Sequence, residues 1–195
     1  MARTSTGNKR ERILDAAVLE IARRGFGATT VAMIARRAGV ADGTIYLYFK
    51  NKDEILRQLF ERAMGRFIAE GGTRLTGVDG AENKLRAIVA LHLELVGQDR
   101  DLAIITQVEL RHSLHFMEEL SRAQVGQYLG IIADVVDQGR REGVFRADCE
   151  PIFAAKAIFG VLDEMATDWI LSQRNVRLES KAVAVAEFVL RGVRA

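Results

Sequence analysis

The sequence predicts an all-α protein of about nine helices, with an N-terminal three-helix domain of the helix-turn-helix type followed by a larger helical domain. Three observations predict this class. Apolar residues recur three and four positions apart along most of the 195 residues, which is the spacing of an amphipathic helix. Proline, which costs a helix interior roughly 3 kcal/mol, occurs once. No segment alternates apolar and polar residues over the length of a strand, so a sheet is not expected.

Capping residues and glycines divide the N-terminal part into four expected helices. Asn8 followed by Glu11, and Asn51 followed by Glu54, have the spacing of an N-cap and its N3 partner. Gly25 can supply the left-handed residue that ends the first helix. The expected ranges are 8–24, 31–38, 41–49 and, from residue 51, a helix that runs toward residue 71.

The segment from Gly71 to Gly80 is the clearest expected loop and the expected hinge between two domains, residues 8–66 and residues 67–195. Asp79 and Glu82 repeat the capping spacing before the next helix. Pro151 falls in the first turn of its helix, where a missing N–H costs little. The expected helices of the second domain are 81–97, 100–111, 113–141, 149–173 and 178–192.

Positive charge is concentrated near the N-terminus. The first 52 residues contain ten Lys and Arg against four Asp and Glu, whereas the remainder contains eighteen against twenty-two. Such an asymmetry is expected where one end of a chain meets a polyanion such as nucleic acid, although ordinary solvated helix faces also produce it. The charge distribution alone therefore leaves both interpretations open.

The composition predicts a cytoplasmic protein with no membrane partner. No apolar run approaches the ~18 residues that a membrane-spanning helix needs. The first eight residues are polar and lack the apolar core of a signal peptide. The single cysteine, Cys149, has no partner for an internal disulfide, which fits a reducing compartment.

Residues 29–52, TTVAMIARRAGVADGTIYLYFKNK, have the pattern of two short helices joined by a tight turn. Gly39 can adopt the positive φ that the turn needs, and Val40 can fill the angle between the helices. Ile45 and Phe49 lie four positions apart and are expected to be buried, which leaves an unusually apolar outer face around Tyr46. This is the pattern of a DNA-binding helix-turn-helix over about residues 30–49, and also of a plain core turn between two packed helices.

The wording of the segment IARRAGVADGTIYLYFKNKDEIL (34–56) resembles the TetR family of repressors, and the resemblance covers about residues 8–66. It implies that the protein is not an enzyme but a regulator that binds double-stranded operator DNA. Arg36 and Arg37 are weaker candidates for phosphate contacts, and Ala41 replaces the small hydroxyl residue that often precedes the recognition helix, so one cap or phosphate contact is expected to be missing. The implied DNA-binding residues are Thr30, Asp42, Gly43, Thr44, Tyr46, Leu47, Tyr48 and Lys52.

Two further segments, DLAIITQVELRHS (101–113) and IFGVLDEMATDWILS (158–172), resemble the TetR-type FadR repressors within that family. These regulate fatty-acid degradation and leave a palindromic operator on binding long-chain acyl-CoA. The resemblance therefore implies acyl-CoA as an effector ligand rather than a cofactor. The alternative is a TetR-type repressor of an efflux or other metabolic gene that senses a different hydrophobic small molecule.

The second domain is rich enough in apolar residues to line a pocket for an acyl chain, although the same residues would also fill a solid core. Glu109 and Arg111 are unexpected charges in an apolar stretch, and can pair with each other, with a dimer mate or with the ligand. Arg86, Arg100, Arg122 and Arg174 are candidates for the phosphates of coenzyme A. The candidate ligand-lining residues are Phe67, Leu91, Leu95, Ile105, Glu109, Arg111, Phe116, Leu129, Ile132, Phe159, Leu162 and Trp169.

Catalytic and metal chemistry are not favoured by the sequence. There is no GxSxG, HExxH or phosphate-binding loop. His112 and His115 are three positions apart and could hold a metal with Glu118 or Glu119, but polar residues at a helix start explain them more simply. We expect no metal and no cofactor, and a helical enzyme is the weak alternative from another class.

The two last expected helices, 149–173 and 178–192, are amphipathic. The family resemblance implies that they pair with those of a second copy around a two-fold axis, which gives a homodimer held by a four-helix interface. Two recognition helices would then lie about one helical turn of DNA apart, ~34–36 Å.

Overall fold

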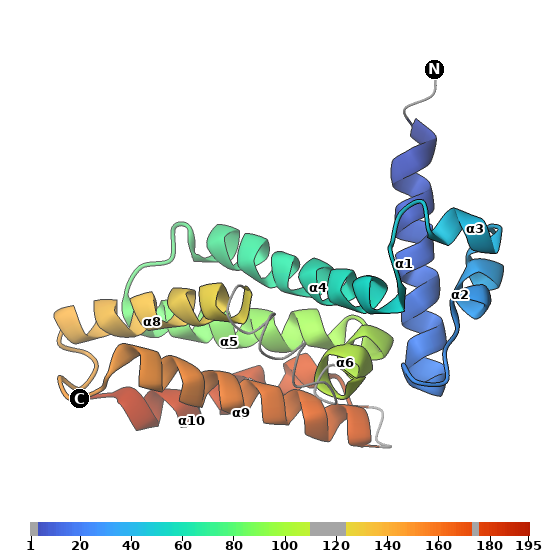
Figure 1. Cartoon of the computed structure of the whole chain (residues 1–195). Coiled ribbons are helices and arrows are strands. Elements are labelled where there is room, and N and C mark those ends of the chain that lie inside the picture. Colours follow the sequence, from blue (N-terminus) through green and yellow to red (C-terminus); the bar gives the residue numbers. More distant parts are fainter. Residues whose placement is uncertain (1–3, 110–123, 173–175) are drawn as a thin grey trace.

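The computed structural model describes residues 4–109, 124–172 and 176–195 (Figure 1). Within these ranges the chain forms nine α-helices and a short 3-10 helix. The described residues contain no strand, and only an isolated antiparallel bridge joins Phe145 to Arg194. The all-α prediction is confirmed.

The N-terminal helices are α1 (Thr4–Arg24), α2 (Val31–Ala38) and α3 (Asp42–Ile45). Helix α1 begins four residues before Asn8, so the prediction that Asn8 caps it is wrong. Helix α3 is also shorter than the predicted range 41–49. The Leu47 N–H donates to a carbonyl three residues back (3.2 Å), and this tighter bonding ends the α-helix in a turn.

Helix α4 (Lys52–Leu75) begins where the sequence predicts and ends later. The Asn51 side chain caps it by accepting the Glu54 N–H at 2.8 Å. The helix continues through the predicted loop start at Gly71, which is buried against α5: a Cβ there would lie 4.0 Å from the Leu91 side chain. The helix therefore passes through residue 71 without a hinge, and the contact with Leu91 leaves room for a Cβ.

The second domain consists of α5, α6, α8, α9 and α10, with the 3-10 helix before α10. The prediction that Asp79 caps α5 is wrong, because Gly80 is the N-cap residue. Pro151 opens α9, as predicted. Helix α8 corresponds to the C-terminal part of the predicted helix 113–141. Residues 113–123 of that prediction lie outside the described residues. The bounds are Ala81–Gly97 (α5), Arg100–Gln107 (α6), Gly126–Arg141 (α8), Pro151–Leu171 (α9), Leu178–Lys181 (3-10 helix) and Ala182–Val193 (α10).

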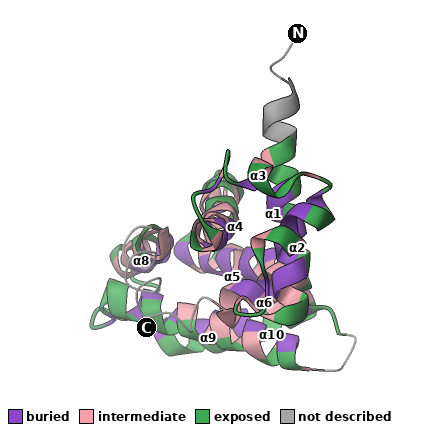
Figure 2. Ribbon diagram, turned by 45° about the vertical axis from the view of Figure 1, so that its right-hand side comes forward, coloured by how far each residue is buried: buried purple, intermediate pink, exposed green. Residues whose placement is uncertain are grey.

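Two hydrophobic cores sit on either side of the molecule, and α4 contributes to both (Figures 1 and 2). The smaller core joins α1, α2 and α3 to the start of α4, through residues such as Ile55 and Leu59. The larger one joins α5, α8, α9 and α10 to α4 from Met64 onward. The helix-turn-helix and the C-terminal domain are therefore connected by one continuous helix.

Candidate DNA-binding surface and candidate ligand site

The turn between α2 and α3 is built on Gly39, as the sequence predicts. Gly39 has φ 65°, in the left-handed region that favours glycine, and its N–H donates to the Arg36 carbonyl. Val40 is half-buried and packs against the N-terminal core. Arg12 of α1 donates to the Ala38 carbonyl at 2.5 Å, which satisfies an acceptor at the end of α2. Helix α1 thus holds the turn in place.

Helix α3 and the turn that follows it, residues 42–49, have one buried and one exposed apolar face. Ile45 and Phe49 are 1% exposed and anchor the segment in the N-terminal core. Tyr46 is 59% exposed and Leu47 is 80% exposed. Large apolar side chains on the surface of a small domain indicate a contact surface.

The other residues predicted for DNA contact differ in how far they reach solvent. Thr30, Asp42 and Gly43 are exposed, whereas Thr44 and Tyr48 are half-buried. The Thr30 hydroxyl accepts the Met33 N–H at 3.2 Å and so also caps α2. No side chain caps α3 at Ala41, as expected for this residue, whereas the loss of a phosphate contact stays a prediction. Tyr48 packs against the N-terminal core, so it has a structural task besides any contact with DNA.

The Lys52 side chain points to the loop between α1 and α2. Its ammonium donates to the carbonyls of Phe26 (2.6 Å) and Thr29 (2.8 Å), and lies 4.3 Å from the centre of the Phe26 ring. The sequence did not predict these partners, because they lie more than twenty positions away. Lys52 holds this loop; its contact with DNA stays a prediction.

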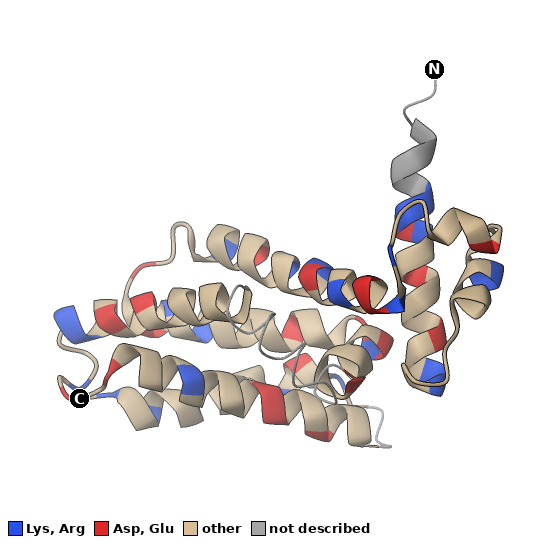
Figure 3. Ribbon diagram, viewed as in Figure 1, with Lys and Arg blue, Asp and Glu red and all other residues tan. Residues whose placement is uncertain are grey.

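A buried carboxylate ties α1 to α2. Glu20, which is 4% exposed, accepts from Arg37 at 2.5 Å and from Arg24 at 3.1 Å. The hydrogen bond from Arg37 is the main cause that holds the pKa of Glu20 below its ordinary value. Arg37 was a candidate phosphate contact, but the structure pairs its guanidinium with Glu20. Figure 3 shows acidic and basic residues mixed along α1 and the start of α4, whereas the charged residues of α2 are all basic.

Helix α6 lies where the two domains meet, next to α1 and α9 (Figure 1). Glu109, just beyond its end, accepts the Phe26 N–H at 2.8 Å. This partner was not among those expected for Glu109, and the expected partner Arg111 lies outside the described residues. Ile105 of α6 is fully buried in the N-terminal core, not with the other candidate ligand-lining residues. The C-terminal domain therefore contacts the helix-turn-helix through α6 as well as α4.

The structure brings part of the predicted ligand-lining set together. Phe67 of α4 and Phe159 of α9 both lie against the larger core. Trp169 is half-buried near the end of α9, and its Nε1–H donates to the Val176 carbonyl at 2.8 Å. Phe116 lies outside the described residues. The remaining members of the set in this domain, Leu91, Leu95, Leu129, Ile132 and Leu162, are all buried.

A polar pair that the sequence analysis missed lies among these aromatic residues. His92 of α5 is 4% exposed and its Nδ1 lies 3.0 Å from the Tyr128 hydroxyl of α8. The ring centres of Phe67 and Phe159 are 4.9 Å and 6.1 Å from that of His92. Burial lowers the pKa of His92 to about 4 and raises the pKa of Tyr128. In the sequence, the position of a single histidine within the apolar run of α5 was the feature that could have indicated this pair.

The described arginines proposed for coenzyme A phosphates have partners within the protein. Arg86 contacts Glu187 at 2.9 Å and Glu82 at 3.3 Å. Arg100 donates to three carbonyls near the end of α9, among them that of Ile170 at 2.7 Å. Arg122 and Arg174 lie outside the described residues.

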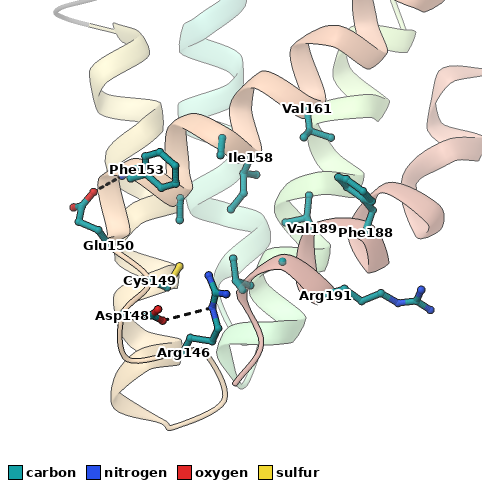
Figure 4. A pocket seen from close by; sticks show the side chains of 14 residues that line it. Arg146, Asp148, Cys149, Glu150, Phe153, Ile158, Val161, Phe188, Val189 and Arg191 are labelled. Carbon is teal, nitrogen blue, oxygen red and sulfur yellow. Dashed lines mark hydrogen bonds and ion pairs between the residues drawn. The ribbon is translucent and has the colours of Figure 1, made fainter.

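Helices α9 and α10 share an exposed apolar face. A groove of about 630 Å³ lies between them and is lined by Phe153 and Phe188, with Cys149 deeper (Figure 4). These two phenylalanines are 71% and 68% exposed, and Val183 is 78% exposed. Figure 3 shows few charges along both helices. An exposed face this apolar indicates a binding partner.

The described part of the chain contains neither a metal-binding cluster nor a membrane-spanning helix. Its residues contain no group of three His, Cys, Asp or Glu side chains that could hold a metal ion. His112 and His115, with Glu118 and Glu119, lie outside the described ranges. No described helix is both long and apolar enough to cross a membrane.

Comparison with known proteins identifies the family. Residues 13–59 match the family described as bacterial regulatory proteins, tetR family, and residues 60–192 match the C-terminal region of YsiA-like proteins. The chain belongs to the TetR family of transcriptional regulators. It is 37% identical to the fatty acid metabolism regulator protein of Bacillus subtilis over 182 residues, 93% of each chain.

Two solved structures are similar to this TetR-family chain along most of its length. The regulator FadR of Bacillus subtilis, in complex with stearoyl-CoA, superimposes with a TM-score of 0.88, 36% identity, and coverage of 94% of this chain and 99% of that one. The fatty acid degradation regulator FadR of Bacillus halodurans gives 0.89 and 36%, covering 94% and 95%. The predicted family and the predicted likeness to FadR regulators are confirmed.

Proposed function

We propose that this TetR-family regulator is a homodimeric repressor of fatty-acid degradation genes, released from a palindromic operator by long-chain acyl-CoA. The likeness that carries this proposal is the structural match, over nearly the whole chain, to a FadR protein in complex with stearoyl-CoA. The similarity includes the C-terminal domain and is not limited to the helix-turn-helix that all members of the family need.

The proposed DNA-binding face centres on the exposed residues Tyr46 and Leu47, with Thr30, Asp42 and Gly43 at its edge. Leucine and tyrosine can contact thymine methyl groups and sugars in the major groove, where an apolar side chain distinguishes thymine from other bases. Helix α4 begins close by; its Asn51 cap takes up the Glu54 N–H, so a phosphate would bind at the earlier N–H groups of that helix start.

Substitution of the α3 outer face tests this surface. Leu47→Ala and Tyr46→Ala remove exposed side chains, so we expect loss of operator affinity with little change in the free energy of unfolding. Val144→Ala, at an exposed apolar residue just after the end of α8, is the matched control. Retained operator affinity in both α3 variants would contradict the assignment. Tyr48→Ala is a poorer test, because Tyr48 also packs against the core.

The proposed dimer forms through the apolar face of α9 and α10. Two copies of this face would bury Phe153, Val183 and Phe188 in a four-helix interface. Phe188→Asp places a charge in that interface and should give a monomer that no longer binds a palindromic operator. Native mass spectrometry of the purified protein is the direct measurement, since it reports the dimer and any co-purified acyl-CoA together. A monomeric wild-type protein would contradict the proposed assembly.

The proposed division of labour places DNA recognition in residues 8–66, and ligand binding and dimerisation in residues 67–195. Helix α4 belongs to both cores, and Glu109 joins the end of α6 to the loop before α2. A ligand that changes how α4 packs on the C-terminal core would change the spacing of the two heads. It can do so only through a difference in affinity for the two arrangements.

A further inference from the structure

The polar pair of His92 and Tyr128 lies in the middle of the C-terminal core. His92 comes from α5, Tyr128 from α8, and the flanking Phe67 and Phe159 come from α4 and α9. Four helices of the proposed ligand-binding domain therefore meet at one point. Both members of the pair are almost fully buried, at 4% and 2% exposed.

The pair does not satisfy its own hydrogen-bonding capacity. His92 is neutral at pH 7, because burial lowers its pKa to about 4, so its ring carries one N–H. If the Tyr128 hydroxyl donates to Nδ1, the proton is on Nε2, which has no hydrogen-bond partner. If Nδ1–H donates instead, the hydroxyl hydrogen needs another acceptor. The first tautomer leaves a buried N–H without an acceptor. The second leaves the Tyr128 O–H without one.

A second unpaired buried atom belongs to the segment that leads into α8. Gln124 precedes Tyr128 by four positions, in the short π-helical segment that leads into α8. The Gln124 side-chain oxygen is buried and has no hydrogen-bond partner. An unpaired buried polar atom costs free energy, and natural proteins keep few of them. A ligand with an acceptor and a nearby N–H donor would satisfy both.

We infer that His92, Tyr128 and Gln124 form the polar subsite for the thioester and the adjoining pantetheine amide of a bound acyl-CoA. The inference rests on the proposed function. The thioester carbonyl is an uncharged acceptor for the free donor of the pair, and the first pantetheine amide follows it after a two-carbon spacer and offers an N–H to Gln124. Phe67 and Phe159 flank the same point and are placed to contact the acyl chain.

The same chemistry disfavours a free fatty acid. The described groups at this point offer a dipolar donor and no positive charge, since His92 is neutral. Asp163 raises the pKa of His92, although burial lowers it by more. A carboxylate therefore already acts on the His92 ring. A second carboxylate would be buried without a cation. A neutral thioester has no such cost.

The test compares two ligands that differ by one oxygen atom. Oleoyl-CoA and its thioether analogue, in which a methylene replaces the carbonyl, are titrated into the full-length dimer by calorimetry, with sodium oleate as the third ligand. The wild-type protein should bind the thioester roughly tenfold more tightly than the thioether, because only the thioester supplies the acceptor. Oleate should bind more weakly than the thioester.

Variants of His92 assign the discrimination to this residue. His92→Leu and His92→Phe remove the ring nitrogens with two different shapes, and should bind thioester and thioether equally. His92→Gln places an amide N–H near the position of Nε2 and should keep part of the preference. Operator binding without ligand shows in each case that the variant is folded.

The outcomes separate the inference from the proposed function. Equal affinity of the wild type for thioester and thioether, or a preference that survives in both apolar variants, would overturn the subsite while leaving acyl-CoA as effector. A wild-type protein that binds neither coenzyme A derivative would overturn the proposed function, and the subsite with it.

Discussion

Replacing Lys52 by methionine separates two roles that the family resemblance and the structure give to this residue. The resemblance places Lys52 on the DNA-binding face. In the structure its ammonium donates to the carbonyls of Phe26 and Thr29, at 2.6 Å and 2.8 Å, and lies over the Phe26 ring. Methionine keeps the apolar stem of lysine and removes only the charged donor.

The contacts of Lys52 allow a rough estimate of the loss in stability. A hydrogen bond from a charged group contributes about 1.5–3 kcal/mol, and a cation over an exposed aromatic ring about 0.5–1 kcal/mol. Lys52 is half-buried, and water replaces part of what is lost in the variant. We therefore expect Lys52→Met to lower the free energy of unfolding by about 2–3 kcal/mol, which lowers Tm by roughly 4–12 °C for a chain of this size.

Two measurements decide between the roles. Urea unfolding at fixed protein concentration gives the change in stability, and the salt dependence of operator affinity reports phosphate contacts. A lost phosphate contact lowers the salt slope by about one unit, whereas a loosened loop leaves it unchanged. Lys50→Met, at an exposed neighbouring position, is the control and should leave stability unchanged. Unchanged stability in Lys52→Met together with a lower salt slope would refute the structural role.

Three other predictions follow from single contacts. Gly139→Ala should lower the free energy of unfolding by about 2–3 kcal/mol, because a Cβ would overlap the buried Phe145 ring, whereas Gly130→Ala in the same helix meets open space and should be neutral or stabilising in urea titrations. The hydrogen bond from Arg194 holds the pKa of Glu82 at about 2, below the ordinary 4.5. The ionised Glu82 therefore stabilises the fold above pH 4.5, and this contribution is lost as the pH falls toward 2. The Tm of Glu82→Gln should vary less with pH over that window. Glu20→Gln removes the charge that pairs with two arginines and should cost about 1–2 kcal/mol in the same titration, with unchanged stability contradicting the ion pair.

The local elements with strong sequence signals were predictable. The predicted range 81–97 is the range of α5, and the Gly39 turn has the left-handed φ that was expected. Both depend on interactions within a few residues. The end of α4 was not predictable in this way, because glycine weakens a helix in isolation, whereas Gly71 lies buried within α4 in the folded chain.

The side-chain roles that were missed depend on partners far apart in the sequence. Lys52 and Arg37 are positively charged and were therefore candidates for DNA contacts, but their partners lie in the α1–α2 loop and on α1. Ile105 has the character of a pocket residue and is buried against the N-terminal domain. His92 was visible as a polar residue in an apolar helix, but only the structure shows that Tyr128 faces it.

The release of operator DNA by acyl-CoA is the measurement that tests the central claim most directly. Selection from random duplexes with the ligand-free dimer supplies the operator, and fluorescence anisotropy then follows the complex as oleoyl-CoA, free coenzyme A or oleate is added. The account predicts a palindromic operator that micromolar oleoyl-CoA releases and that coenzyme A alone does not. An operator complex that survives oleoyl-CoA but is released by oleate or by a cationic drug would contradict it.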